Sequence, residues 1–328
     1  MSLLIFSSAN KIAQGIIKRL YASNQFERII CADLYPTYSS VQRFLYFREE
    51  LDEINSSTTL IERKIEEKSD LIKAISEASH LVYITHDYYT LVPSKLNLIK
   101  TTAQLAKNAK LEKFIALTPI EHDHYNEQNS LVKTDISIDE AKAAYPNLVH
   151  LKSDITFGQH SSFADILIRR IVNGQPIHFK PENPNALSSP IFSDDIATIV
   201  ESCLKDSSIQ EKSYLLQGSK QYTIGDMIST LQRHTSREAK INESIIEKVL
   251  PPTHVNFISE RLYEPEYINF AQFIKQYKPL DQSGFENLDS FGITFKAMEE
   301  IYLPNKATMN ISRNPSSITE KIITKVLD

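Results

Sequence analysis

A tyrosine and a lysine, which can transfer protons together, do not occur here at the spacing that one helix requires. A tyrosine four positions before a lysine shares its helix face, where the ammonium lowers the phenol pKa and prepares it to exchange a proton with a carbonyl substrate. Lys133 opens an expected helix, but Asn129 stands four positions before it. Tyr125, eight positions before Lys133, would lie about 12 Å away along the helix axis.

A hydroxyl group at the end of a strand would be the third component of such a site. Thr118 follows the apolar run Phe114–Leu117 and is itself followed by Pro119. Thr118 and Lys133 are therefore the vestigial parts of a proton-transfer site, and the sequence predicts a protein that has no turnover of its own.

A turn that could receive phosphates follows the first apolar run, Leu3–Phe6. Its residues are Ser7-Ser8-Ala9-Asn10-Lys11-Ile12-Ala13, so a Gly-x-x-Gly-x-x-Gly pattern would fall on Ser7, Asn10 and Ala13. We expect Ser7 and Asn10 to weaken phosphate binding, because a non-glycine residue in a left-handed conformation costs about 1–2 kcal/mol and a side chain at Asn10 would protrude toward the phosphates. The chain has seven glycines, and none lies between Gly15 and Gly158.

Asp33 ends the second apolar run, where an acid would hold the ribose hydroxyls of NAD and repel the 2′-phosphate of NADP. The alternative, that Asp33 only ends a strand, is equally well supported by the residues. The candidate nucleotide-binding residues are Ser7, Ser8, Asn10, Lys11, Ile12, Asp33, Thr85 and Lys133.

The elements that would position these residues alternate along the first half of the chain. Strands are predicted at Leu3–Phe6, Arg28–Ala32, Thr59–Glu62, Leu81–Thr85, Phe114–Leu117 and Leu148–Leu151, and helices at 10–23, 39–54, 69–77, 94–109 and 133–144. This alternation predicts βαβ units, and hence an α/β, doubly wound parallel sheet of Rossmann type over residues 1–160.

The second half is less regular. Helices are predicted at Phe163–Val172, 193–205 and 223–235, a strand at Tyr214–Gln217 and a loop at Pro181–Pro190. Elements from 190–235 should complete the first domain, and 161–328 should form a smaller, irregular C-terminal region that packs on it or on partner subunits.

Composition excludes several classes of protein. The formal net charge of −5 and the pI near 6.0 argue against a nucleic-acid binder. Cys31 and Cys203 have neither disulfide nor zinc spacing, and we expect buried thiols. No apolar run reaches the ~20 residues of a membrane span.

Two polar clusters and the N-terminus have alternative readings. Glu121-His122-Asp123-His124 has metal-ligand residue types but is more typical of a solvated loop, so we predict no metal site. His86–Tyr89 follows a strand at the rim of the sheet, where a capping or packing role is favoured over substrate binding. Residues 1–26 have the composition of a mitochondrial transit peptide, yet they also read as the first strand and helix, which we favour.

Four segments resemble a known family. They are Lys133–Gly158, which contains Ser-Asp-Ile-Thr-Phe-Gly; Pro190–Ala197; Lys212–Gly218; and Leu288–Glu299. The chain resembles the atypical short-chain dehydrogenases over about residues 3–305, and within them it is most similar to the Rossmann-type accessory subunits of mitochondrial respiratory complex I.

This resemblance implies a non-catalytic accessory subunit with a structural or assembly role on the matrix arm of complex I. The implied location is the matrix side of the mitochondrial inner membrane, as a peripheral protein. Its partners would be other matrix-arm subunits, with peripheral membrane contact but no transmembrane segment and no nucleic acid. NAD(H) or NADP(H) would bind weakly or not at all. Two alternatives stay open: an NAD-dependent atypical short-chain oxidoreductase or epimerase, and an NmrA-like dinucleotide-sensing protein.

Overall fold

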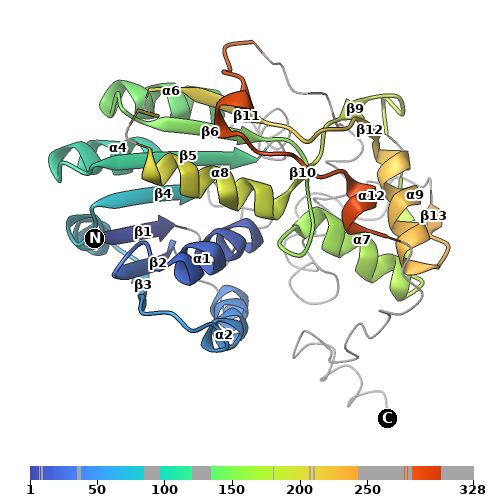
Figure 1. The fold of residues 1–328 in the computed structure, drawn as a ribbon, viewed down its shortest axis with the longest axis horizontal. Coiled ribbons are helices and arrows are strands. Elements are labelled where there is room, and N and C mark those ends of the chain that lie inside the picture. The colour runs from blue at the N-terminus through green and yellow to red at the C-terminus, as the bar shows by residue number, and fades with distance from the viewer. Residues whose placement is uncertain are drawn as a thin grey trace, which may run out of the picture.

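A seven-stranded parallel sheet forms the larger lobe of the computed structural model (Figure 1). The structure describes residues 1–6, 8, 10–34, 38–84, 97–119, 134–179, 181–206, 208–209, 211–242, 277, 279 and 283–303. The sheet order is β11-β6-β5-β4-β1-β2-β3. The strands are β1 (Ser2–Phe6), β2 (Arg28–Leu34), β3 (Thr59–Ile65), β4 (His80–Ile84), β5 (Lys113–Pro119), β6 (Val149–Ser153) and β11 (Ser213–Leu216).

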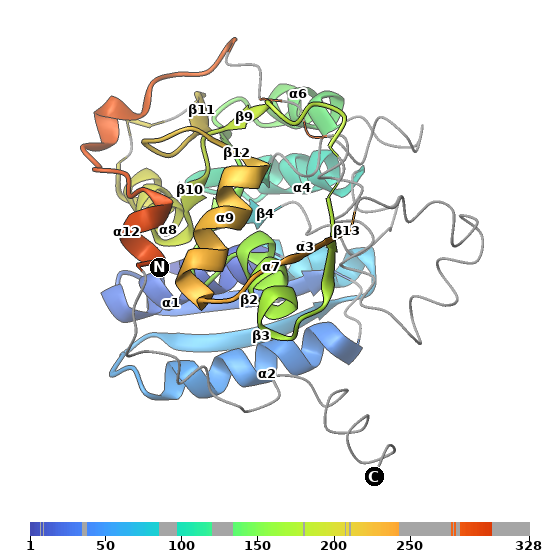
Figure 2. The same ribbon diagram turned by 90° about the vertical axis from the view of Figure 1, so that its right-hand side faces the viewer.

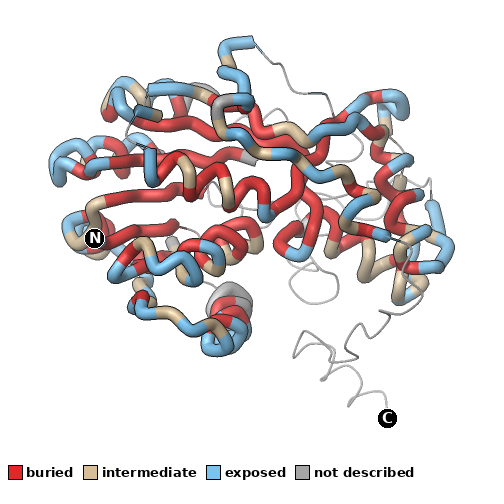
Figure 3. The backbone as a smooth tube through the Cα atoms, in the orientation of Figure 1, coloured by how far each residue is buried: buried red, intermediate tan, exposed pale blue. Residues whose placement is uncertain are grey.

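Helices cover both faces of this sheet, because its central strands are buried on both sides. Every residue of β1, β4 and β6 is buried, and Figure 3 draws these strands in red. One face packs on α1 (Lys11–Ser23), α2 (Tyr38–Asp52) and α8 (Ser193–Lys205), and the other on α3 (Lys68–Ser76), α4 (Asn97–Asn108) and α6 (Thr134–Ala144). The predicted doubly wound α/β fold is confirmed, and Ser2–Phe6 and Lys11–Ser23 form its first strand and helix.

The smaller lobe has its own apolar core and lies beside the carboxyl ends of the strands (Figures 1 and 2). It contains α7 (Ser162–Val172), α9 (Ile224–Thr235) and α12 (Met298–Ile301). In the part of the chain that the structure describes, two-stranded sheets pair β10 (Ile191–Phe192) with β7 (Thr156–Phe157), β12 (Tyr222–Thr223) with β9 (Leu187–Ser188), and β13 (Lys240–Asn242) with β8 (Pro176–His178). The predicted proline-containing loop therefore includes a short strand, β9.

A buried carboxylate holds that β9 segment in place. Asp154, directly after β6, accepts hydrogen bonds from Ser188 Oγ at 2.7 Å and Ser189 N at 2.9 Å. Burial raises the pKa of Asp154, although these hydrogen bonds act in the opposite direction. Such a buried group needs its partners, so Asp154 fixes where the chain enters the smaller lobe.

Residues 283–303, the C-terminal strap, run from the edge strand β11 across the molecule to the smaller lobe (Figure 1). The strap contains the short 3-10 helix η3 (Leu288–Phe291) and α12. Glu286 N donates to Ser213 O at 2.7 Å, and Lys296 N donates to Asp195 Oδ2 at 3.2 Å. Gly158 N donates to the hydroxyl oxygen of Tyr302 at 2.8 Å. The strap thus connects both lobes.

Both cysteines are buried free thiols, as expected. Burial raises the pKa of Cys203 to about 12, so this thiol stays protonated at neutral pH. In the part of the chain that the structure describes, no helix has the length and apolar character needed to cross a membrane.

Candidate functional site

The start of α1 is the first part of the candidate site, and Asn10 decides its geometry. Asn10 is the N-cap residue, with φ −70° and ψ 139°, and it is buried. Its Oδ1 accepts hydrogen bonds from Ile12 N at 2.7 Å and Ala13 N at 3.4 Å. The expected left-handed strain at Asn10 is therefore wrong: the backbone is extended, and the side chain folds back onto the helix instead of protruding.

The neighbouring residues of this turn have distinct roles. Ser8 is buried, and its N–H donates to Ala32 O on β2 at 3.5 Å. The side chain of Ile12 lies in the apolar core, so only its backbone can face a ligand. Lys11 reaches across to the smaller lobe, where its Nζ lies 2.6 Å from Asp165 Oδ2 of α7. Ser7 lies outside the described residues.

Gly15, the first glycine of the chain, serves lobe packing and not phosphate binding. A Cβ at Gly15 would come within 3.1 Å of the His160 ring. His160 is buried against α1, and burial lowers the pKa of its imidazole. The missing side chain at Gly15 therefore allows the smaller lobe to approach α1.

Asp33 lies at the carboxyl end of β2, next to Ala32, whose carbonyl oxygen accepts the hydrogen bond from Ser8 N in the turn. It is paired in register with Lys64 of β3, and its side chain is half-buried. Its negative charge contributes, after burial, to the raised pKa of Cys31. Asp33 and the start of α1 thus lie at the same edge of the sheet.

Thr118, at the carboxyl end of β5, is bonded to a residue that the sequence analysis missed. Thr118 Oγ1 lies 2.8 Å from His150 Nε2 on the neighbouring strand β6, and both side chains are buried. Burial, together with the charges of Lys142 and Lys152, lowers the pKa of His150 to about 3, so its ring is neutral at physiological pH. A histidine inside the otherwise apolar run Leu148–Leu151 was the available signal.

Several predicted residues cannot be placed. Thr85 and Lys133 lie outside the described residues, although Lys133 directly precedes α6. The clusters His86–Tyr89 and Glu121–His124 also lie outside them, as do Tyr125 and Asn129. The structure therefore brings together Ser8, Asn10, Lys11, Ile12 and Asp33, with Thr118 two strands from β1 in the sheet order. Among the described residues, no group of three or more histidine, cysteine or carboxylate side chains could hold a metal ion.

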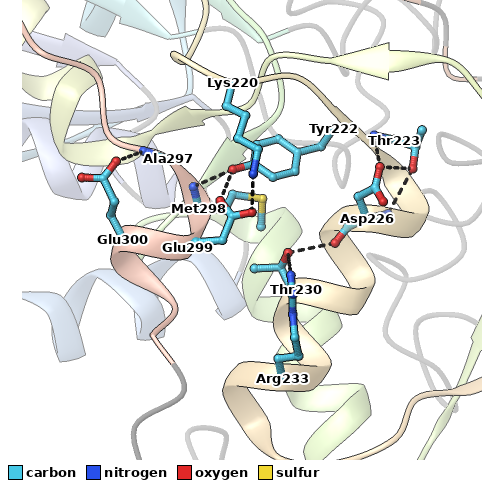
Figure 4. Close-up of polar contacts among 10 residues, drawn as sticks. All are labelled: Lys220, Tyr222, Thr223, Asp226, Thr230, Arg233, Ala297, Met298, Glu299 and Glu300. Atoms are coloured by element: carbon cyan, nitrogen blue, oxygen red, sulfur yellow. Dashed lines mark hydrogen bonds and ion pairs between the residues drawn. The ribbon is translucent and has the colours of Figure 1, made fainter.

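A separate cavity of about 820 Å³ lies in the smaller lobe, lined by residues of α9, β12 and α12 (Figure 4). Two of its carboxylates, Asp226 and Glu299, bond to other groups of the protein. Glu299 accepts hydrogen bonds from Lys220 Nζ at 2.7 Å and from the Tyr222 hydroxyl, and Asp226 caps α9 through Thr223. Met298 N donates to the Tyr222 hydroxyl at 3.2 Å. The bonds of Met298 and Glu299 attach the strap to β12, so we assign this network a structural role.

Comparison with known proteins identifies the fold. No protein-family model and no curated protein matches the sequence. A nucleoside-diphosphate-sugar epimerase from Staphylococcus aureus superimposes with a TM-score of 0.61 at 12% identity, covering 93% of this chain and 100% of that chain. A structure from a study of pinoresinol-lariciresinol and phenylcoumaran benzylic ether reductases gives a TM-score of 0.59 at 13% identity, covering 93% and 99%.

A third structure is the UDP-glucose 4-epimerase of Thermus thermophilus in complex with NAD, with a TM-score of 0.52 at 12% identity, covering 83% of this chain and 99% of that chain. The chain therefore has the fold of NAD(P)-dependent epimerases and reductases of the extended short-chain dehydrogenase type. The similarity to short-chain dehydrogenases is confirmed at this level. The finer resemblance to complex I accessory subunits finds no support in these structures.

One sequence-based prediction is contradicted. The missing tyrosine–lysine pair predicts a chain that is not an enzyme. The structures that share its fold are those of epimerases and reductases, so the fold is one that enzymes use and it does not support the prediction of a non-enzymatic subunit. The absence of one residue pair is an insufficient reason, since a lysine can act as an acid–base group without a tyrosine.

Proposed function

We propose that this protein is an NAD(P)-dependent oxidoreductase or epimerase that binds its dinucleotide at the carboxyl ends of β1 and β2. The observation that carries the proposal is the joint position of Lys11, at the start of α1, and Asp33, at the end of β2, at one edge of a doubly wound sheet. In such sheets ligands bind at the point where the strand order reverses, which here lies between β1 and β4.

The residues present fit a dinucleotide, although Asn10 lowers the number of N–H donors available to it. The Asp33 carboxylate can accept hydrogen bonds from ribose hydroxyls, and the positive end of α1 with Lys11 favours phosphate oxygens. Asn10, however, already occupies the N–H groups of Ile12 and Ala13. Fewer donors remain for the phosphates, so we expect weak binding, and Asp33 should favour NAD(H) over NADP(H).

A bound nicotinamide dinucleotide would supply hydride transfer to or from a substrate carbon. The chain must then hold and move the accompanying proton. We assign this task to Lys133, which directly precedes α6, because an ammonium group can give a proton to a developing alkoxide. Thr118, fixed by neutral His150, would offer its hydroxyl at the end of β5.

A coenzyme-dependent activity screen tests the proposal. NADH and NADPH oxidation would be followed with a panel of carbonyl compounds, and isomerisation would be followed with nucleotide sugars. We expect NADH-dependent turnover that falls by about 100-fold or more in Lys133→Ala. Lys100→Ala is the matched control, because Lys100 lies on the surface of α4 and pairs with Glu140. Equal rates in Lys133→Ala and the wild type would remove Lys133 from the site.

We propose separately the location and the partners that the sequence predicted, namely the mitochondrial inner membrane and the subunits of complex I. The resemblance to matrix-arm accessory subunits motivates a peripheral position on the mitochondrial inner membrane. Comigration with complex I on native gels would support it, and recovery only as a free protein would contradict it.

A further inference from the structure

Asp165 connects the two lobes at the start of α1, where we place the dinucleotide site. It lies in the first turn of α7, and its Oδ2 accepts a hydrogen bond from Lys11 Nζ at 2.6 Å. Arg169 Nε, one turn further along α7, lies 3.3 Å from the same oxygen. These three side chains are only about one third exposed, with relative exposures of 29% for Lys11, 32% for Asp165 and 33% for Arg169.

Three groups at the start of α1 that would attract an anion are therefore already engaged by oxygen atoms of the protein. The side-chain oxygen of Asn10 accepts from Ile12 N and Ala13 N. The Asp165 carboxylate pairs with the ammonium of Lys11. The Asp165 carboxylate is negatively charged, as a phosphate is, and both would pair with the ammonium of Lys11.

We propose that Asp165 is an internal competitor for the coenzyme pyrophosphate and sets the affinity of the site for NAD(H). This inference rests on the proposed function, because it assumes that a dinucleotide binds at the start of α1. Phosphates that approach Lys11 meet the Asp165 charge, and Lys11 must leave Asp165 to pair with them. Because Asp165 belongs to the smaller lobe, coenzyme binding and the contact between the lobes are coupled.

A purely structural role for this ion pair makes a different prediction. If Asp165 only holds α7 against α1, its loss would lower the stability of the protein without raising its affinity for dinucleotides. If closed lobes are needed for binding, its loss would weaken the affinity. The direction of the change in affinity therefore separates the three accounts.

The test compares Asp165→Asn with the wild-type full chain by calorimetric titration of NADH, NAD⁺ and inorganic pyrophosphate. Removing one negative charge near the phosphates should lower each Kd roughly fivefold in dilute buffer, and the gain should shrink as salt is added. Glu50→Gln is the matched control. Glu50, on α2, pairs at 3.6 Å with Lys18, which lies on the same helix as Lys11, and it does not contact Lys11 itself. Its Kd values should equal those of the wild type.

Lys11→Gln provides a second variant in case Asp165→Asn folds poorly. It should weaken binding of all three probes, and adding Asp165→Asn to it should bring a smaller gain than in the wild type. If the wild type binds NADH or NAD⁺ and Asp165→Asn has the same or a higher Kd, the inference is overturned. The proposed function then stays intact. If neither the wild type nor any variant binds NADH or NAD⁺, both the proposed function and this inference fail.

Discussion

Thr118 Oγ1 and His150 Nε2 lie 2.8 Å apart between the neighbouring strands β5 and β6, and both side chains are buried. Because burial keeps the imidazole neutral, the ring can orient the hydroxyl of Thr118 without adding charge to the site. His150 therefore adds no charge at neutral pH to the strand ends around it.

The neutral state of His150 predicts a pH dependence of stability. Burial lowers its pKa from 6.5 to about 3, so below pH 6.5 the unfolded chain binds a proton that the folded chain does not. The free energy of unfolding contributed by this group is therefore complete above pH 6.5 and is lost as the pH falls, by about 1.4 kcal/mol for each unit well below 6.5. Denaturant unfolding at pH 7 and pH 5 should show a larger loss for the wild type than for His150→Gln. Equal losses would contradict a buried, neutral His150.

Asn10 should stabilise α1 as a cap. Asn10→Ala removes the acceptor for Ile12 N and Ala13 N and should lower the free energy of unfolding by about 1 kcal/mol. Asn10→Asp keeps an acceptor, so it should change the free energy of unfolding by only about a few tenths of a kcal/mol. Thermal and denaturant unfolding of the three proteins measure this difference. A harmless Asn10→Ala would mean that the cap contributes nothing.

Gly158 is predicted to tolerate no side chain. Its φ is +104°, and a Cβ would lie 2.5 Å from the Phe192 ring and 2.9 Å from Ser193 Oγ. Gly158→Ala should therefore cost about 3 kcal/mol through strain and overpacking together. Gly292→Ala is the control, because Gly292 also has a positive φ, +61°, but nothing lies within 4 Å of its Cβ position. It should cost about 1 kcal/mol, and similar losses for the two variants would contradict the close contact at Gly158.

Asp33 should set the choice between the two coenzymes. Its carboxylate repels a 2′-phosphate, so Asp33→Ser is expected to raise the affinity for NADPH relative to NADH by about tenfold. Titration of both coenzymes into the wild type, Asp33→Ser and the surface control Asp52→Asn measures the ratio of their Kd values. An unchanged ratio in Asp33→Ser would leave Asp33 as a residue that only ends β2.

The sequence predicted the larger lobe well because its signals are local. Apolar runs such as Leu3–Phe6 and Phe114–Leu117 appear as β1 and β5, and the helix expected at 193–205 appears with these bounds. The paired strands β9 and β12 were missed, because a strand of only two residues shows no periodicity in the sequence. Such a strand depends on distant partners such as Asp154. The same reason explains the missed contacts of Lys11 with Asp165 and Thr118 with His150.

Asn10 shows a different limit of sequence reasoning. Compared with a glycine pattern, it suggested a strained backbone, whereas the structure places it as an extended cap. The residue type was compatible with both outcomes, because asparagine tolerates left-handed conformations and is also a preferred N-cap. Only the position of its Oδ1 relative to Ile12 N and Ala13 N separates them.

Native mass spectrometry of the full chain with NADH and NAD⁺ tests the central claim most directly. The account predicts one dinucleotide bound per chain, displaced by excess of the other oxidation state and tighter in Asp165→Asn. A wild-type chain and an Asp165→Asn variant that both stay free of dinucleotide at millimolar NADH would contradict an NAD(P)-dependent enzyme of this fold.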